Sequence, residues 1–101
     1  MQLITEYQLS PLATEDLRKI WRFGAGKWGV EQAETYGDKL FDAFEFLVRN
    51  PRAGQSIDEI RENYRRHIIG SHSIIYRLNS DTVEIIRILH QRMDPERHLS
   101  H

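Results

Sequence analysis

The spacing of apolar residues changes once along this chain, near residue 50, and that change limits the fold more than any other feature. Before it, apolar residues recur every three or four positions, the period of an amphipathic helix. After it, short runs rich in β-branched and aromatic residues are separated by turn residues. Helices followed by strands predict an α+β fold, in which the helices pack on one face of the sheet.

The first half predicts one strand and two helices. Residues 4–9 read as a short strand, and Ser10-Pro11 then begins a helix, because serine caps free N–H groups and proline suits the first helical position. A Gly-Ala-Gly run at residues 24–26 is expected to end this helix and turn the chain. The second helix runs from about residue 30 to 49, where Asn50-Pro51 stops it. The short link predicts an antiparallel helical hairpin.

The second half predicts an antiparallel three-stranded meander. The strands are residues 64–69, 72–78 and 82–90, joined by short turn sequences. The polar stretch through Gln55-Ser56 is expected to be a loop, and residues 94–98 one helical turn. The predicted order is therefore β-α-α-β-β-β, with the N-terminal strand and the helical hairpin packed on an antiparallel sheet.

Composition narrows the class of protein. With 101 residues the chain can build one core, so residues 1–101 are expected to form a single domain. The absence of cysteine excludes disulfides, thiolate zinc sites and thiol nucleophiles. No apolar run is long enough to span a bilayer, and the first residues lack a signal-peptide pattern. We therefore expect a cytoplasmic protein without a membrane partner.

The charges are distributed unevenly. Residues 1–60 carry seven Lys/Arg against ten Asp/Glu, whereas residues 61–101 carry seven against five and hold all five histidines. Every cation in the second segment is arginine, whose planar fork binds carboxylate or phosphate bidentately. Arginines on strands therefore indicate either a recognition surface for an anionic partner or scattered cross-strand ion pairs. Because the net charge is −1, long-range attraction to nucleic acid is weak.

The last predicted strand is apolar on both faces, although the chain offers only one helical hairpin to cover it. A buried central strand shows this pattern, so a partner chain is expected to cover the second face. Strict alternation assigns one face to Val83, Ile85, Arg87 and Leu89, and the other to Glu84, Ile86, Ile88 and His90.

The histidines suggest no metal centre. No pair has metal-protease spacing, and His98 with His101 forms an isolated pair at the end of the chain. We expect neither a metal nor a cofactor. His90 closes a strand, with His67 and His72 on the neighbouring hairpin, so a general acid or base near a bound phosphodiester is the enzymatic alternative.

Three blocks of sequence, in order, resemble the ParE branch of the RelE/ParE toxin superfamily. The first is Tyr7-x-Leu9-Ser10-Pro11-x-Ala13-x-x-Asp16-Leu17, and the second is Trp28-Gly29-x-x-Gln32-Ala33-x-x-Tyr36. The third is the C-terminal half, in which Ile88-Leu89-His90-x-Arg92-Met93-Asp94 is the most ParE-like piece. Each block alone is weak, but their ordered combination covers nearly the whole chain.

The resemblance implies the toxin of a type II toxin–antitoxin system, with a small α+β fold. ParE-type toxins poison DNA gyrase by trapping its DNA cleavage complex, which arrests growth and stabilises plasmids, and they perform no chemistry themselves. The implied partners are DNA gyrase and a ParD-like antitoxin, which has a ribbon-helix-helix DNA-binding part and a segment that wraps the toxin. The toxin would contact DNA only indirectly, through the antitoxin or gyrase.

The resemblance also suggests which residues make these contacts. The residues expected to bind the target are Arg65, Arg77, Arg87, His90, Arg92 and Met93. The residues expected to bind the antitoxin are Phe41, Phe46, Ile86 and Ile88.

Two alternatives stay open. The RelE branch contains ribosome-dependent mRNA endonucleases, in which Arg65, Arg77 and His90 would be the catalytic residues. The slightly negative net charge and the presence of only three lysines weigh against an enzyme that works on ribosomal RNA. A non-toxic relic that retains antitoxin binding is the second alternative.

Overall fold

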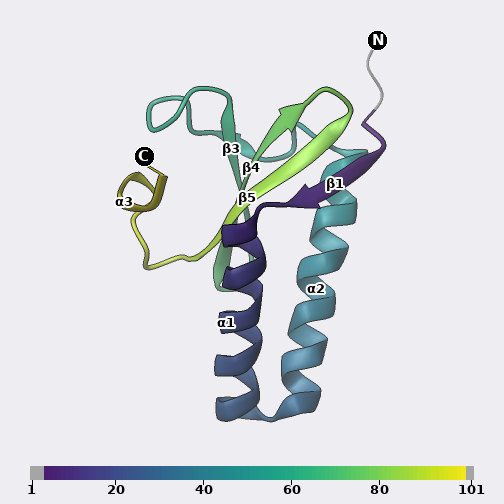
Figure 1. The fold of residues 1–101 in the computed structure, drawn as a ribbon, viewed down its shortest axis with the longest axis vertical. Coiled ribbons are helices and arrows are strands. Elements are labelled where there is room, and N and C mark those ends of the chain that lie inside the picture. Colours follow the sequence, from purple (N-terminus) through teal and green to yellow (C-terminus); the bar gives the residue numbers. More distant parts are fainter. Residues whose placement is uncertain (1–3, 100–101) are drawn as a thin grey trace.

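The computed structural model describes residues 4–99, in which a long helical hairpin packs on a five-stranded sheet (Figure 1). The predicted α+β class is confirmed. In chain order the elements are β1 (Glu6–Leu9), α1 (Pro11–Trp28), α2 (Val30–Arg49), β2 (Gln55–Ser56), β3 (Tyr64–Ile69), β4 (His72–Asn79), β5 (Thr82–His90) and α3 (Pro95–Leu99).

The sheet has the order β1-β5-β4-β3-β2. Strands β3, β4 and β5 form the predicted antiparallel meander. Two features differ from the prediction. β1 pairs in parallel with β5, from Glu6 beside Thr82 to Leu9 beside Ile85. The Gln55–Ser56 stretch, predicted to be a loop, is a two-residue strand antiparallel to β3. Neither pairing could be predicted from the local sequence, because the spacing of apolar residues does not indicate which distant strand a segment pairs with.

The helical hairpin begins as predicted and turns later than predicted. Ser10 Oγ accepts a hydrogen bond from the backbone N–H of Ala13 at 3.0 Å, which caps α1. The helix does not end at residues 24–26 but continues to Trp28, and the chain turns at Gly29 with φ +98°. A Cβ on Gly24 would lie 3.5 Å from the Cβ of Ala33. An added methyl group would thus be in ordinary contact with α2, so close packing of the helices does not require glycine at position 24, whereas the positive φ of Gly29 favours glycine at the turn.

The main core lies between the hairpin and the sheet. The start of α1 and the end of α2 pack on the inner residues of β4 and β5, and removal of this apolar surface from water is the main driving force for folding. The buried residues of this core are Ala13, Leu40, Ala43, Phe44, Leu47, Ile74, Tyr76, Val83, Ile85 and Ile88.

A β-bulge in β5 changes which residues face the helices. Ile75 of β4 lies opposite Arg87 and Tyr76 lies opposite Ile85, so Ile86 is an extra residue on β5. Two residues then oppose one, which shifts the alternation beyond that point. Ile85 faces the helical core before the bulge and Ile88 faces it afterwards, whereas Leu89 lies on the other face. The strict alternation predicted for β5 is therefore wrong after Ile85.

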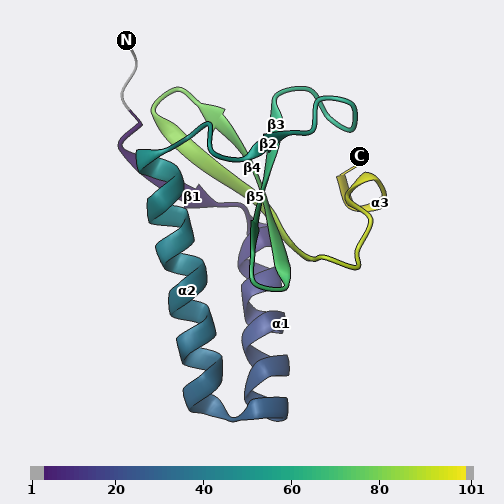
Figure 2. The same ribbon diagram turned by 180° about the vertical axis from the view of Figure 1, so that it is seen from behind.

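The second face of the sheet is covered by the chain itself, which corrects the expectation that a partner must cover it. The segment between β2 and β3 and the short helix α3 lie over this face (Figure 2). They form a second cluster, with Ile60 and Ile86 packed against it. The buried members of the second cluster are Ile57, Tyr64, Ile75, Leu89 and Leu99.

The first turns of α1 complete the edge of β5 where β1 ends. Ser10 Oγ donates a hydrogen bond to the carbonyl of Ile86 at 2.7 Å, and Asp16 Oδ2 accepts one from the N–H of Ile88 at 2.9 Å. Arg87 donates to both carboxylate oxygens of Asp16, at 2.8 and 3.0 Å. This hydrogen bond raises the pKa of the Arg87 guanidinium above its ordinary value. The pair fixes α1 against the sheet.

Asp16→Ala is expected to destabilise the protein strongly, because it leaves the largely buried Arg87 guanidinium without its carboxylate and the Ile88 N–H without its acceptor. Removing one partner of a buried pair costs about 3–5 kcal/mol, and each kcal/mol lowers Tm by roughly 4–8 °C in a domain of this size. Asp16→Asn retains an acceptor and should lose less. The control is Glu15→Ala, whose exposed contact with Arg18 contributes little. Thermal unfolding followed by circular dichroism measures all three, and equal losses for Asp16→Ala and Glu15→Ala would contradict the assignment.

Gly54→Ala should also destabilise the fold, whereas Gly37→Ala should stabilise it. A Cβ on Gly54 would lie 2.6 Å from Oη of Tyr76, which accepts from the Gly54 N–H and donates to the Pro51 carbonyl. Such overpacking costs about 1–3 kcal/mol. Gly37 lies inside α2 with nothing within 4 Å of an added Cβ, so alanine gains roughly 0.5–1 kcal/mol there. Urea unfolding of both variants tests this pair, and a Gly54→Ala midpoint at or above the parent's would refute it.

Candidate functional site

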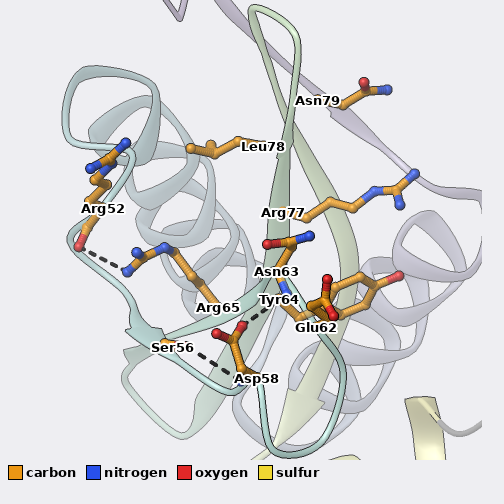
Figure 3. A pocket seen from close by; sticks show the side chains of 10 residues that line it. All are labelled: Arg52, Ser56, Asp58, Glu62, Asn63, Tyr64, Arg65, Arg77, Leu78 and Asn79. Carbon is orange, nitrogen blue, oxygen red and sulfur yellow. Dashed lines mark hydrogen bonds between the residues drawn. The ribbon is translucent and has the colours of Figure 1, made fainter.

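The residues expected to bind a target lie in three separate places. Arg65 and Arg77 line a polar pocket of about 410 Å³ where β3 begins (Figure 3). His90 and Met93 line an apolar groove of about 570 Å³ on the side of the helical hairpin. Arg87 lies between the two, bonded to Asp16.

The polar pocket contains both signs of charge. Arg65 Nη1 donates to the carbonyl of Gly54 at 2.7 Å. It also donates, less closely, to the carbonyl of Arg52 (Figure 3). Arg77 Nε donates to Glu84 Oε1 at 3.0 Å across the β4–β5 pair. These contacts fix both side chains while leaving each guanidinium with further N–H groups for an acceptor. The residues that line this pocket are Arg52, Ser56, Asp58, Glu62, Asn63, Tyr64, Arg65, Arg77, Leu78 and Asn79.

Among the strand arginines, Arg77 forms a cross-strand ion pair with Glu84, whereas Arg87 pairs with Asp16 of α1. The Arg77–Glu84 contact is half-exposed and contributes little to stability. The Arg87 side chain is only 16% exposed, and its guanidinium donates hydrogen bonds to both carboxylate oxygens of Asp16. Arg87 therefore holds the fold together and cannot recognise a partner without breaking that pair.

The apolar groove follows the part of the helical hairpin that extends past the sheet (Figures 1 and 2). Gly24 of α1 and Ala33 of α2, which lie close together, both line it. Its lining residues are Lys19, Ile20, Phe23, Gly24, Trp28, Gln32, Ala33, Tyr36, Ser71, His72, His90 and Met93.

A hydrogen-bonded chain crosses one wall of this groove. The Tyr36 hydroxyl accepts from the N–H of Ser71 at 3.1 Å, and 2.6 Å separates it from Nδ1 of His72. The hydroxyl and Nδ1 share a hydrogen bond, and the tautomer of His72 decides which of the two donates. The His72 and His90 rings meet edge to face with centroids 5.4 Å apart. Burial and the neighbouring His90 lower the pKa of His72, although Asp16 opposes them.

The residues expected to bind an antitoxin divide by exposure. Phe41 and Phe46 both lie half-exposed on α2, where Phe46 stacks on the ring of His67. Ile88 is 3% exposed within the main core, and Ile86 packs against the second cluster. The side chain of Ile88 is therefore inaccessible to a partner and that of Ile86 is only slightly accessible, so neither can anchor an antitoxin.

The catalytic trio of the endonuclease alternative is not assembled. Arg77 pairs opposite Tyr64 at one end of β4, whereas His90 pairs opposite His72 at the other end. Arg77 and His72 are five positions apart on β4, or about 17 Å at ~3.3 Å per residue. His90 therefore cannot act on the same bond as Arg65 and Arg77.

The sequence patterns did not predict the groove that Trp28 and Tyr36 line. The apolar stripes of the two helices could have predicted this groove, because they are longer than the short strands can cover. Within residues 4–99 no group of three or more potential ligands could hold a metal ion, and His101 lies outside that range. Across the same residues, no helix is long and apolar enough to cross a bilayer.

Comparison with known proteins identifies the relatives of this fold. The family model for the ParE toxin of type II toxin–antitoxin system, parDE, matches residues 7–95. The chain belongs to the ParE toxin family. Toxin ParE1 of Mycobacterium tuberculosis is 44% identical over 96 residues, which cover 94% of this chain and 98% of that protein. Toxin ParE1 of Caulobacter vibrioides is 43% identical over 93 residues, covering 92% and 96%.

A solved structure supports the fold of this ParE family member. A chain of the chromosomal ParDE TA system from P. aeruginosa superposes with a TM-score of 0.75, at 20% sequence identity, over 86% of this chain and 96% of that one. The resemblance to the ParE toxins inferred from the sequence blocks is therefore confirmed.

The His72 site should make the stability of this ParE toxin depend on pH. Its pKa is lowered in the folded state, so between that pKa and the unfolded value of about 6.5 the unfolded chain binds more protons. The contribution of His72 is complete above pH 6.5 and is lost as the pH falls through the folded pKa. Tm should therefore fall less between pH 7.5 and 5 in His72→Gln than in the parent. Burial also lowers the pKa of His67, so His67→Gln should act in the same direction. Parallel Tm profiles for parent and His72→Gln would contradict this.

Proposed function

We propose that this chain poisons DNA gyrase by trapping its DNA cleavage complex, and that a cognate ParD-like antitoxin with a ribbon-helix-helix part neutralises it. It would act in the cytoplasm as a binding protein and not as an enzyme. It would contact DNA only indirectly, through gyrase or the antitoxin. The observation that carries this proposal is the 44% identity to a ParE1 toxin over 98% of that toxin's length, which leaves no domain of the relative unmatched.

The separation of Arg65 and Arg77 from His90 also favours inhibition over RNA cleavage. A general acid or base must lie within hydrogen-bond reach of the proton that it transfers. The two arginines line the polar pocket, whereas His90 lines the apolar groove. A binding protein can use two distant surfaces at once, because a macromolecular partner spans both.

The proposed gyrase-binding residues are those that remain accessible. Arg65 and Arg77 present unused N–H groups in the polar pocket. Arg92 and Met93 are exposed in the segment that follows β5. His90 adjoins them at the rim of the groove. For the antitoxin, Phe41 and Phe46 are the proposed anchors on α2, because aromatic side chains exposed together mark contact surfaces.

Purified protein should inhibit supercoiling by gyrase and convert plasmid into linear DNA when the reaction is stopped with detergent. The cognate antitoxin, mixed in before the toxin meets gyrase, should prevent both effects. Arg→Lys at positions 65, 77 and 92 keeps the charge but loses the planar fork, so at least one variant should inhibit more weakly with little change in Tm. Arg87→Lys should instead lower Tm, because its fork holds Asp16.

A matched assay with ribosomes and mRNA separates the alternatives. Ribosome-dependent cleavage that disappears in His90→Ala, with gyrase unaffected, would establish the endonuclease. No effect in either assay, with the antitoxin still bound, would identify a non-toxic relic. If all three Lys variants inhibit gyrase as well as the parent, the target surface lies elsewhere, on the helical hairpin.

A further inference from the structure

The helical hairpin has a second exposed side, apart from the apolar groove. The groove takes Phe23 from α1 and Tyr36 from α2. Trp21 lies two positions from Phe23, which is about 200° around the helix. Phe41 lies five positions from Tyr36, about 140° around α2. Both helices therefore present residues on a side that the groove does not use, and we call this side, defined by Trp21, Gly37 and Phe41, the hairpin flank.

The hairpin flank is apolar and uncovered in the single chain. Trp21 and Phe41 are 44% and 42% exposed. An added Cβ on Gly37 would meet nothing within 4 Å, so the surface of α2 is open at that point. Gly24 lies beside Ala33 in the antiparallel hairpin, so Trp21, three positions before Gly24, is level with Gly37 to within one residue. An aromatic ring on α1 thus stands at the same height as an opening on α2.

The exposed charges of the hairpin are separated by helix. From Arg18 to the end of α1 every charged residue is a cation, whereas α2 carries five acids against two cations. The cations of this part of α1 are Arg18, Lys19, Arg22 and Lys27, and the acids of α2 are Glu31, Glu34, Asp38, Asp42 and Glu45. Within residues 4–99, only Arg18 of this set forms an ion pair, with Glu15 of its own helix. A surface with a basic half and an acidic half is complementary to a second copy of itself.

We propose that the hairpin flank is the interface of a homodimer. A two-fold axis that runs parallel to the helices, between two facing hairpins, sets α1 of each copy against α2 of the other. Because Trp21 and Gly37 are level, this axis brings each Trp21 ring over Gly37 of the second copy, beside Phe41. By the same count Arg22 lies within one residue of the level of Glu34, so opposite charges meet across the interface.

The hairpin flank is large enough for a weak dimer. Helices of 18 and 20 residues are about 27 and 30 Å long, and two adjacent helices are roughly 20 Å wide. They offer roughly 550 Å² per copy, which is less than the ~800 Å² per partner of a standard interface. The dimer therefore forms at micromolar concentration and dissociates on dilution.

The dimer is independent of the proposed function, because it forms in the free chain without gyrase or antitoxin. Its failure would leave gyrase inhibition standing, and failure to inhibit gyrase would leave the dimer standing. The two proposals meet at one side chain. Phe41 is also a proposed antitoxin anchor, so the antitoxin and the second copy compete for it.

Gly37→Gln separates the interface from the fold. Glutamine favours a helix more than glycine does and meets no atom at this position, so the variant should melt at a higher temperature than the parent when both are dilute and monomeric. Its side chain fills the opening, so the dissociation constant of the dimer, measured by sedimentation equilibrium, should rise at least tenfold.

Gly26→Gln is the matched control. Gly26 also lies inside a helix with nothing within 4 Å of an added Cβ, and it is about 140° around α1 from Trp21. This variant should gain thermal stability in the same way and leave the dissociation constant unchanged. A parent that stays monomeric at high micromolar concentration would overturn the proposal, and so would a dimer that both glutamine variants leave intact.

The charges give a second readout. Arg22→Glu and Glu34→Arg should each weaken the dimer, and the double variant should recover most of the loss, because the exchange restores opposite charges across the axis. Lys19→Glu makes the same change of charge on the groove side of α1 and should have little effect. Losses that add in the double variant would overturn the pairing of α1 with α2 of the second copy. Unchanged self-association of Gly37→Gln with weaker antitoxin binding would assign the flank to the antitoxin and also overturn the proposal.

Discussion

The buried pair between Asp16 and Arg87 is the contact on which the positions of α1, β5 and α3 depend. Asp16 also receives the N–H of Ile88, so one carboxylate completes the edge of β5 where β1 ends. Arg87 reaches past it to the carbonyl of His98, which ties α3 to the same place. These bonds fix α1 to the sheet near its N-terminal end, and the opposite end of the helical hairpin extends past the sheet (Figure 1).

The bulge at Ile86 makes this arrangement possible. Without it, strict alternation would place Leu89 with Ile85 on the helix face and Ile88 on the other. The extra residue instead lets Ile88 join the main core while Leu89 enters the second cluster. It also brings Arg87 opposite Ile75, from where its side chain reaches Asp16. The extra residue Ile86 thus allows β5 to contribute side chains both to the main core and to the second cluster.

Local signals in the sequence were sufficient for the helices and the meander, and insufficient wherever distant segments meet. Ser10-Pro11 and Asn50-Pro51 act within a few residues, so the start of α1 and the end of α2 were predictable. The parallel β1–β5 pairing and the cover of the second face depend on contacts between residues far apart in the chain. The sequence identified arginines as candidate site residues but not the groups that they contact. Arg87, for example, bonds to Asp16, which lies 71 positions away in the chain.

The pairing of β1 with β5 has a consequence for how the chain is made. The first strand of the sheet can find its neighbour only after residues 82–85 have been synthesised, so this edge of the sheet closes after β3 and β4 have been made. The five-residue α3 is too short to form by itself and must fold onto the finished sheet. While it grows on the ribosome, the chain therefore has a helical hairpin and an incomplete sheet. A product that stops before residue 92 lacks α3, and with it the Leu99 side chain that helps to cover Leu89 and Ile75. Proteases and chaperones recognise apolar surfaces exposed in this way.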